Sequence, residues 1–296
     1  LFGDPFDEVD CSLGFGRQGH QPDPSSGHLL QAAELVVVGR ADVFERVGTA
    51  GSVDSGDVGS FEVTAGHHGL DPAVLTARLV DSFEARGERF EMETLDIRGV
   101  PTKVWKNAPA NLRFVALAGR AHGDRLFTIY EDERVTYDAW FRAVARLAAE
   151  FRERGVEKGD RVALAMRNVP EWPVAFFAAV TIGAICVPLN AWWTGAELAF
   201  GLANSGAKLL VCDDERWDRI SEHRAEFPGL ESVFVSRCRG EPEGAERLET
   251  IIGKPDDYAV LPEAELPEVE IAPEDEATIF YTSGITGQPK GALGTH

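Results

Sequence analysis

Long apolar runs and basic side chains are both scarce in this chain. No apolar run approaches the roughly 20 residues that a membrane span needs, and no signal peptide opens the sequence. The 49 Asp and Glu outnumber the 29 Lys and Arg, which leaves a formal net charge of −20. Such a charge repels nucleic acid and anionic membranes. We therefore expect a cytoplasmic protein with no nucleic-acid partner and no integral membrane segment, and the oligomeric state stays open.

Cysteine is also sparse, with four residues and no CxxC pair: Cys11, Cys186, Cys212 and Cys238. Their wide separation excludes a cysteine-based metal site by spacing, and we expect reduced, packed thiols. No metal ligands can be assigned.

Residues 1–69 contain few apolar runs but hold 12 of the 30 glycines and four of the seven histidines. A segment that buries so little surface is predicted to be a low-order extension. It is either a flexible part of the protein or translated sequence foreign to it. Gly14–Gly19 matches the dinucleotide pattern GxGxxG, but prolines follow where a helix should begin, and His67-His68 is expected to be solvated. Leu1 replaces an initiator methionine, so we expect a piece of a longer protein.

From Leu70 onward, short apolar runs alternate with segments of helical periodicity. This alternation predicts an α/β fold in which helices flank parallel sheets. The expected helices are 71–87, 140–155, 171–182, 195–204 and 216–227, and the expected strands are 126–130, 134–137, 162–166, 184–187, 208–212, 232–235 and 277–281.

Three further regions complete the predicted domain organisation. Residues 70–252 form a first α/β subdomain, and residues 253–276 form an acidic, solvated connector with nine carboxylates and one lysine. Residues 277–296 begin a second, truncated α/β subdomain that carries a phosphate-binding loop.

That loop follows the strand at 277–281 and reads Thr282-Ser283-Gly284-Ile285-Thr286-Gly287-Gln288-Pro289-Lys290-Gly291. Glycines allow several backbone N–H groups to approach one anion, and the hydroxyls and the lysine add donors. The spacing differs from a Walker A loop, because proline rather than glycine precedes the lysine. The loop is therefore expected to hold a triphosphate without being a P-loop of that type.

The pattern Thr-Ser-Gly-x-Thr-Gly-x-Pro-Lys-Gly resembles the phosphate-binding signature of the adenylate-forming (AMP-binding) superfamily. Three further segments, 160–163, 167–172 and 183–193, resemble bacterial fatty-acyl-CoA synthetases. The resemblance covers roughly residues 70–296, the front part of the large N-terminal domain. It implies that Thr282, Ser283, Gly284, Thr286, Gly287 and Lys290 bind the phosphates of ATP. The family's catalytic residues correspond to positions beyond His296, so none is assigned.

The resemblance implies an AMP-forming acid–CoA ligase that uses ATP, Mg²⁺ and coenzyme A. A small carboxylic acid, by analogy a fatty acid, becomes an acyl-adenylate and is then transferred to coenzyme A. The chain alone is expected to be inactive. The alternative is a catalytically incomplete fragment that at most binds phosphate weakly, and an amino-acid adenylation domain fits the segment around Trp192 and Trp193 less well.

Several positions near these motifs leave alternatives open. Ile285 stands where the family usually has serine or threonine. Loss of a hydroxyl that touches the triphosphate would weaken ATP use about 10- to 100-fold; alternatively, Ile285 points inward and the other donors suffice. Trp192 and Trp193 are expected to pack against the sheet, with an acyl channel as the alternative. Arg167 and Glu171 are expected to form a surface ion pair or a cap.

Overall fold

The computed structural model describes residues 90–282 and 289–296. The chain divides into two compact units, Leu1–Ala108 and Pro109–His296. Three predicted features lie outside the described residues: the low-order extension with its GxGxxG and His67-His68 motifs, the helix at 71–87, and loop residues 283–288.

In the first unit, the described residues form a β-hairpin of β1 (Met92–Ile97) and β2 (Val100–Trp105). Arg98 and Gly99 make the turn with positive φ angles of 53° and 82°. The Gly99 N–H donates a hydrogen bond of 2.8 Å to the Asp96 carboxylate, which closes the turn. This hairpin was not predicted from the sequence.

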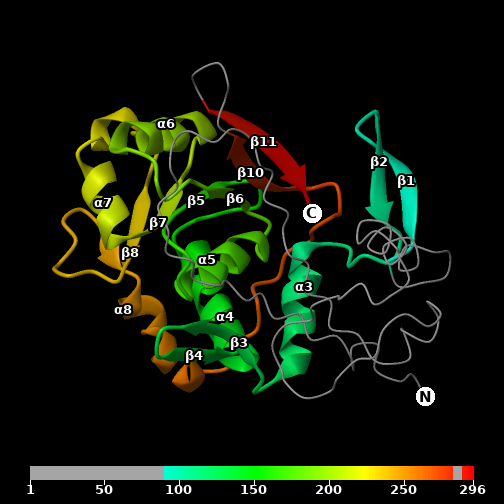
Figure 1. Cartoon of the computed structure of the whole chain (residues 1–296), viewed down its shortest axis with the longest axis horizontal. Coiled ribbons are helices and arrows are strands. Elements are labelled where there is room, and N and C mark those ends of the chain that lie inside the picture. Colours follow the sequence, from blue (N-terminus) through cyan, green and yellow to red (C-terminus); the bar gives the residue numbers. More distant parts are fainter. Residues whose placement is uncertain (1–89, 283–288) are drawn as a thin grey trace, which may run out of the picture. The chain divides into compact units, whose positions relative to one another are not determined.

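The second unit is built on a seven-stranded sheet. Its order is β11 (Lys290–Thr295), β10 (Glu276–Thr282), β6 (Ile185–Pro188), β5 (Arg161–Ala165), β7 (Leu209–Asp213), β8 (Ser232–Ser236) and β9 (Glu246–Arg247). Every neighbouring pair is parallel except β10 and β11 (Figure 1). The predicted α/β class with a parallel sheet is confirmed.

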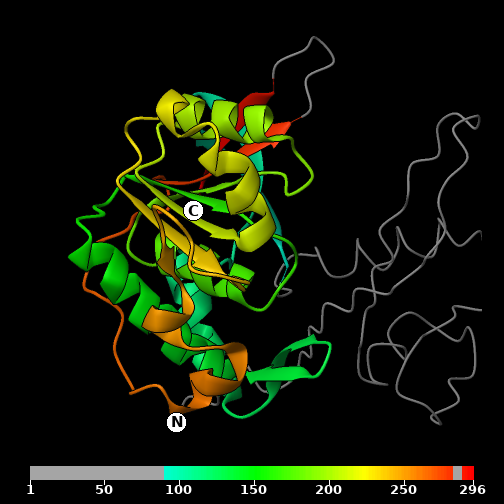
Figure 2. The ribbon, with the colours of Figure 1, turned by 90° about the vertical axis from the view of Figure 1, so that its left-hand side faces the viewer.

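Helices cover both faces of this sheet, because successive strand residues point to opposite sides. On one face, α4 (Tyr137–Glu153) and α5 (Glu171–Val180) pack against Val162, Leu164 and their row neighbours. On the other face, α6 (Gly195–Ser205) and α7 (Asp214–Ser221) pack against Ala163 and Ala165 (Figure 2). The four helices were predicted, although α7 ends earlier and a short 3₁₀ turn, η2 (Arg224–Glu226), follows it.

Smaller elements surround this core. The predicted hairpin is confirmed as β3 (Leu126–Tyr130) and β4 (Glu133–Thr136), whose turn places Glu131 at a positive φ. Helix α3 (Leu112–Gly119) begins at Asn111, whose side chain accepts the Phe114 N–H. The remaining elements are η1 (Arg120–His122), α8 (Glu249–Ile252) and η3 (Pro255–Val260).

The acidic connector, residues 253–276, combines exposed carboxylates with a few buried residues. Tyr258 is fully buried and Leu266 is 5% exposed, and both belong to the core beside α4. Cations also hold the connector's backbone: Arg113 donates to the Pro267 carbonyl at 2.8 Å, and Arg142 donates to the Leu261 carbonyl at 2.8 Å. Seven of the nine carboxylates are exposed, while these buried residues and backbone contacts attach the connector to the first α/β layer.

The strands that flank the predicted phosphate loop join this sheet. Strand β10 pairs in parallel with β6 through Thr278 and Cys186, so residues 276–295 extend the sheet beyond β6. Ala277 and Thr278 are buried at this edge. The predicted domain boundaries, including the start of a second subdomain at residue 277, stay a prediction.

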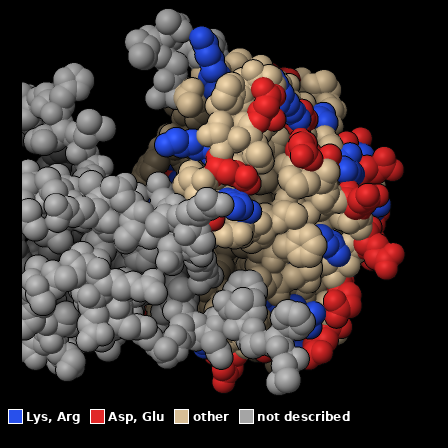
Figure 3. Space-filling model, turned by 90° about the vertical axis from the view of Figure 1, so that its right-hand side faces the viewer, with Lys and Arg blue, Asp and Glu red and all other residues tan. Residues whose placement is uncertain are grey.

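Charges of both signs are mixed on the surface. On the face in Figure 3, Lys and Arg lie beside Asp and Glu. Ion pairs of the described residues include Lys158 with Asp275 at 2.6 Å. None of the helices in the described part of the chain has both the length and the apolar character to cross a bilayer.

Candidate substrate site at the carboxyl edge of the sheet

The parallel strands bring several loops to one edge of the sheet. From β5 the chain moves to β6 on one side, and then crosses to β7 on the other side of β5. In open α/β sheets, ligands bind at the carboxyl ends of the strands where the order reverses in this way. The loops after β5 and β6, together with the junction of β7 and α7, therefore define a candidate site.

A pocket of about 500 Å³ opens at this edge. It combines aromatic and apolar walls with a few polar groups, which is typical of small-molecule sites. Its lining residues are Tyr130, Met166, Arg167, Asn168, Trp172, Leu189, Asn190, Ala191 and Trp192.

Arg167 and Trp192 stack on each other in this pocket. The guanidinium carbon of Arg167 lies 3.9 Å from the centre of the Trp192 ring, and Trp192 is 70% exposed. The stack orients the guanidinium while leaving its N–H groups free. Within residues 90–282 and 289–296 the guanidinium has no carboxylate partner. The prediction that the tryptophans pack against the sheet is therefore wrong for Trp192, because this indole lines the pocket.

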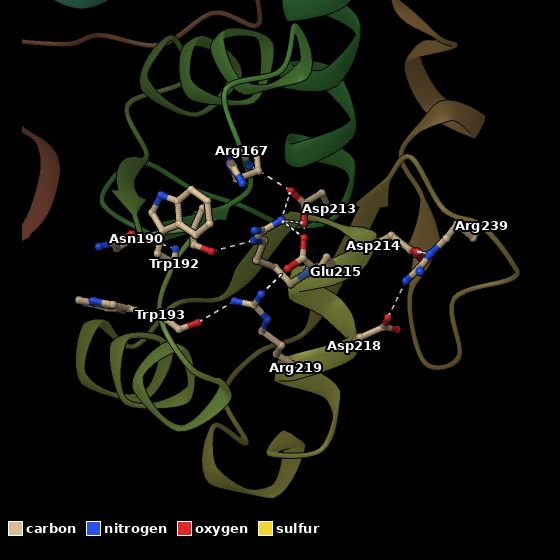
Figure 4. Close-up of polar contacts among 12 residues, drawn as sticks. Arg167, Asn190, Trp192, Trp193, Asp213, Asp214, Glu215, Asp218, Arg219 and Arg239 are labelled. Atoms are coloured by element: carbon tan, nitrogen blue, oxygen red, sulfur yellow. Dashed lines mark hydrogen bonds and ion pairs between the residues drawn. The ribbon is translucent and has the colours of Figure 1, made fainter. Parts of the chain in front are cut away.

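Behind the pocket, Asp213 and Arg216 form a buried ion pair (Figure 4). Asp213 ends β7 and caps α7 by accepting the Arg216 N–H at 3.0 Å. The Arg216 Nη1 lies 3.1 and 3.0 Å from the two carboxylate oxygens. Asp213 is 7% exposed and Arg216 is 1% exposed, so the pair is almost completely removed from water.

The loop after β6 also reaches the strand that leads into the predicted phosphate loop. The Arg219 guanidinium donates to the Trp193 carbonyl at 3.1 Å (Figure 4). The Trp193 ring lies 5.8 Å from the Tyr281 ring, and the Tyr281 hydroxyl donates to Asn204 on α6 at 2.7 Å. Trp193 thus packs as predicted, and its contact places the end of β10 beside the loop that carries Trp192.

Two of the six predicted phosphate-binding residues lie in the described part of the chain. Thr282 and Lys290 are register partners at the ends of β10 and β11, and the Thr282 hydroxyl donates to the Lys290 carbonyl at 3.4 Å. Among the described residues, the Lys290 ammonium has no ion-pair partner. Ser283, Gly284, Thr286 and Gly287 lie outside the described residues, as does Ile285. The phosphate-binding set therefore stays a prediction.

Glu171 has a different partner from the one predicted. It is 1% exposed at the start of α5 and pairs with Arg237 at 2.9 Å, not with Arg167. Arg237 also binds Glu133 at 2.7 Å and lies over the Tyr130 ring of the pocket. Burial raises the pKa of Glu171, and the nearby Arg237 only partly opposes this rise. This network supports the wall of the pocket that Tyr130 forms.

Asp213, Arg216, Asn168 and Asn190 were not identified from the sequence. A signal was available, because polar residues that directly follow buried strands collect at the carboxyl edge of a parallel sheet. Asp213 ends one such strand, and Asn168 and Asn190 follow two others.

Comparisons with known proteins agree with this fold. The AMP-binding enzyme family matches residues 115–296. The long-chain-fatty-acid–CoA ligase FadD13 of Mycobacterium tuberculosis is 34% identical over 167 residues, which cover 56% of this chain and 30% of the ligase. The 4-coumarate–CoA ligase 2 of Oryza sativa subsp. japonica is 32% identical over 161 residues, which cover 51% of this chain and 27% of that protein. The chain thus spans about three tenths of the length of these curated relatives.

Solved structures share the fold. The anthranilate CoA ligase AuaEII in complex with anthranoyl-AMP gives a TM-score of 0.58 at 23% identity, covering 64% of this chain and 36% of that one. The inhibitor-bound N-terminal domain of FACL13 from Mycobacterium tuberculosis gives 0.52 at 27% identity, covering 64% and 45%. Since the family match includes more than half of its residues, the chain belongs to the AMP-binding enzyme family, a group of adenylate-forming proteins.

Proposed function

We infer that the protein takes part in the ATP-dependent ligation of a carboxylic acid to coenzyme A. The observation that carries this proposal is the pairing of Thr282 with Lys290 across β10 and β11, which brackets the signature loop at the carboxyl edge. The nearby pocket supplies a second binding volume at the same edge. The matched ligases act on different acids, and a fatty acid is proposed by analogy with FadD13.

Two displacements make up the proposed reaction. A carboxylate oxygen attacks the α-phosphorus of ATP, which forms an acyl–phosphate bond and releases pyrophosphate. The sulfur of coenzyme A then attacks the acyl carbon, the acyl–oxygen bond to AMP breaks, and the thiol proton passes to solvent. Neither step needs a protein nucleophile, because orientation and charge stabilisation can supply the acceleration.

The chain's own residues would bind and orient the phosphates. Lys290 contributes an ammonium that has no ion-pair partner among residues 90–282 and 289–296, and Thr282, Ser283 and Thr286 contribute hydroxyls. Gly284 and Gly287 allow backbone N–H groups to face the same anion. Gly291 has a separate packing role, because a Cβ there would lie 2.9 Å from Ile279.

The donor set fits phosphate oxygens better than it fits a metal ion. Residues 90–282 and 289–296 contain no group of three or more His, Cys, Asp or Glu side chains that could hold a metal. Mg²⁺ bound to ATP would neutralise part of the phosphate charge.

Pyrophosphate release with ATP and a series of carboxylic acids tests the proposal. The assay compares this chain, and any longer product of the same gene, with the variants Lys290→Ala and Lys254→Ala. Lys290→Ala should lower kcat/KM for ATP about 10- to 100-fold, because a charge-assisted hydrogen bond contributes about 1.5–3 kcal/mol. Lys254 is exposed and far along the chain from the loop, so its variant should match the parent. Equal activity of the two variants would contradict the assigned role of Lys290.

One alternative has a specific observation in its favour. The chain spans only about three tenths of the length of its curated relatives, so it could bind phosphate without completing catalysis. Binding of ATP or pyrophosphate by calorimetry, with no acid-dependent pyrophosphate release, would support this alternative for the chain alone.

A further inference from the structure

The Asp213–Arg216 pair contacts the backbone of two other loops at the carboxyl edge. Asp213 accepts the Arg167 N–H at 3.0 Å, which fixes the loop after β5. Arg216 Nε donates to the Ala191 carbonyl at 2.9 Å, which fixes the loop after β6. Since Asp213 ends β7 and Arg216 lies in the first turn of α7, one buried unit joins the β7–α7 junction to both loops of the switch point.

A gain in the stability of the fold does not by itself explain why this ion pair is buried. Removing two charges from water is costly, and well-packed apolar residues often stabilise a fold as much as a buried ion pair does. The Arg216 Nη2 is also buried without a hydrogen-bond partner among the described residues. A pair with these costs is better explained by what its directional bonds hold in place.

The Asp213–Arg216 pair holds the backbone next to both members of the Arg167–Trp192 stack. The backbone N–H of Arg167 itself donates to Asp213, and Trp192 directly follows Ala191, whose carbonyl accepts from Arg216. The stack brings side chains from the two loops together at 3.9 Å in the pocket. Small shifts of either backbone would separate the indole from the guanidinium, because neither side chain is fixed by burial.

We propose that Asp213 and Arg216 are positioning residues that set the Arg167–Trp192 stack for recognition of an anionic substrate group in this pocket. The group is the carboxylate of the acid or a phosphate of coenzyme A, which share the chemistry that a free guanidinium binds. The inference rests on the proposed function for its substrates. Arg216 acts through the Ala191 carbonyl and touches no reactant.

Arg216→Lys tests this role, because lysine keeps the buried charge but cannot reproduce the planar fork to Asp213 and Ala191. Its matched control is Arg239→Lys, an exposed arginine that pairs with Asp214 and Asp218 outside the pocket. KM is measured separately for ATP, for the acid and for coenzyme A. We expect KM for the acid or for coenzyme A to rise about tenfold in Arg216→Lys, with kcat and the KM for ATP changed less than about twofold.

The KM values for the acid and for coenzyme A show which of the two substrates supplies the anionic group. Unchanged KM values for both the acid and coenzyme A would overturn the proposal. So would an equal rise for all three substrates, since a general loss of structure produces that result. Thermal unfolding of both variants shows whether the fold is retained.

A double-mutant cycle with Trp192→Ala distinguishes positioning from simple stabilisation. If Arg216 acts through the stack, Arg216→Lys should add less than about twofold to the KM change once Trp192 is absent. If the effects of Arg216→Lys and Trp192→Ala on KM multiply in full, Arg216 does not act through the stack.

A spectroscopic readout keeps the positioning role testable even if the ligase activity fails. The emission of Trp192 is isolated as the difference between the chain and its Trp192→Phe variant. Arg216→Lys should shift this difference spectrum and increase its quenching by iodide, whereas Arg239→Lys should leave both unchanged. Absence of acid-dependent pyrophosphate release would reject the proposed function, and an unshifted Trp192 spectrum would reject the positioning role.

Discussion

Glu171 is a carboxylate whose environment opposes its charge. It is 1% exposed, and burial raises its pKa although Arg237 lies 2.9 Å away. A raised carboxyl pKa means that the folded state binds the proton more tightly than the unfolded state does. Its contribution to stability is thus fully present below the unfolded pKa and is lost as the pH rises through the folded pKa.

Replacement of Arg237 by methionine should enlarge this effect. The variant leaves Glu171 buried without its cation, and we expect a loss of about 3 kcal/mol at neutral pH, the lower end for a broken buried pair, because Arg237 is partly exposed. The deficit should shrink as the pH falls and Glu171 becomes protonated. Urea unfolding at several pH values measures it.

Arg239→Met serves as the control for that change. Arg239 also contacts two carboxylates but its side chain is 76% exposed, so its loss should cost no more than about 1 kcal/mol. A deficit in Arg237→Met that is independent of pH would contradict the role given to Glu171.

The cysteines show which properties of single residues could be predicted from the sequence. Cys186 and Cys212 are buried free thiols, and burial raises the pKa of the half-buried Cys238 to about 11. The prediction of packed thiols is confirmed for Cys186 and Cys212, whereas Cys11 lies outside the described residues. By contrast, the pairing of Glu171 with Arg237 could not be predicted, because the two residues meet only after α5 and β8 are assembled.

At the scale of elements, α6 and α7 are held at close range by Gly195. A Cβ at this position would lie 2.5 Å from the Arg219 carbonyl oxygen and 2.9 Å from the His223 ring. Because a backbone atom is the nearest contact, the two helices would have to separate.

Gly195→Ala should therefore destabilise the protein by about 1–3 kcal/mol, despite the better helix propensity of alanine. Gly229→Ala is the matched control, because a Cβ at Gly229 meets no atom within 4 Å and should change stability by less than about 0.5 kcal/mol. Urea unfolding compares the two, and equal stabilities would show that α6 and α7 can adjust freely.

Element prediction succeeded where one physical signal dominated. Strands such as β5 and β7 are short apolar runs, and α4 repeats its apolar residues at helical spacing, so both types were identified. Strand β11, which contains Gly291 and Gly294, has no such run and was missed. Its pairing with β10 is decided by the partner strand, which local sequence does not reveal.

At the scale of the whole molecule, Arg113 connects three parts of the second unit. From α3 it donates to the Thr181 carbonyl after α5 at 2.7 Å and to the Pro267 and Leu266 carbonyls of the connector at 2.8 and 3.3 Å. Arg120 also reaches the connector, but its contact with Glu265 is exposed.

Arg113→Met should release the connector without unfolding the sheet. Cleavage by a glutamate-specific protease at Glu265 and Glu268 should become about tenfold faster, because cleavage follows the population of the open segment. The Arg120→Met variant should be cleaved at nearly the rate of the parent protein. Mass spectrometry of the products gives the sites and rates, and identical rates in both variants would contradict the anchoring role of Arg113.

The candidate site was predicted only in part at this scale. A phosphate loop could be predicted because its residues are consecutive, and that assignment stays a prediction. The pocket combines Tyr130, Arg167 and Trp192 from separate segments, so a local pattern could indicate the strand ends but not which side chains meet there. The sheet order brings them together, and that order depends on strand pairing between distant parts of the chain.

The sheet order also has a consequence for folding during synthesis. Strand β6 ends at Pro188, but its outer neighbour β10 begins only at Glu276 and pairs with it through a single bridge. While the ribosome makes the intervening residues, the inner strands β6, β5, β7 and β8 can already assemble, yet the outer edge of β6 remains open. An uncovered edge strand is a template for wrong pairing with another nascent chain. The outer edge of β6 is therefore covered only when the strands that flank the predicted phosphate loop have been made.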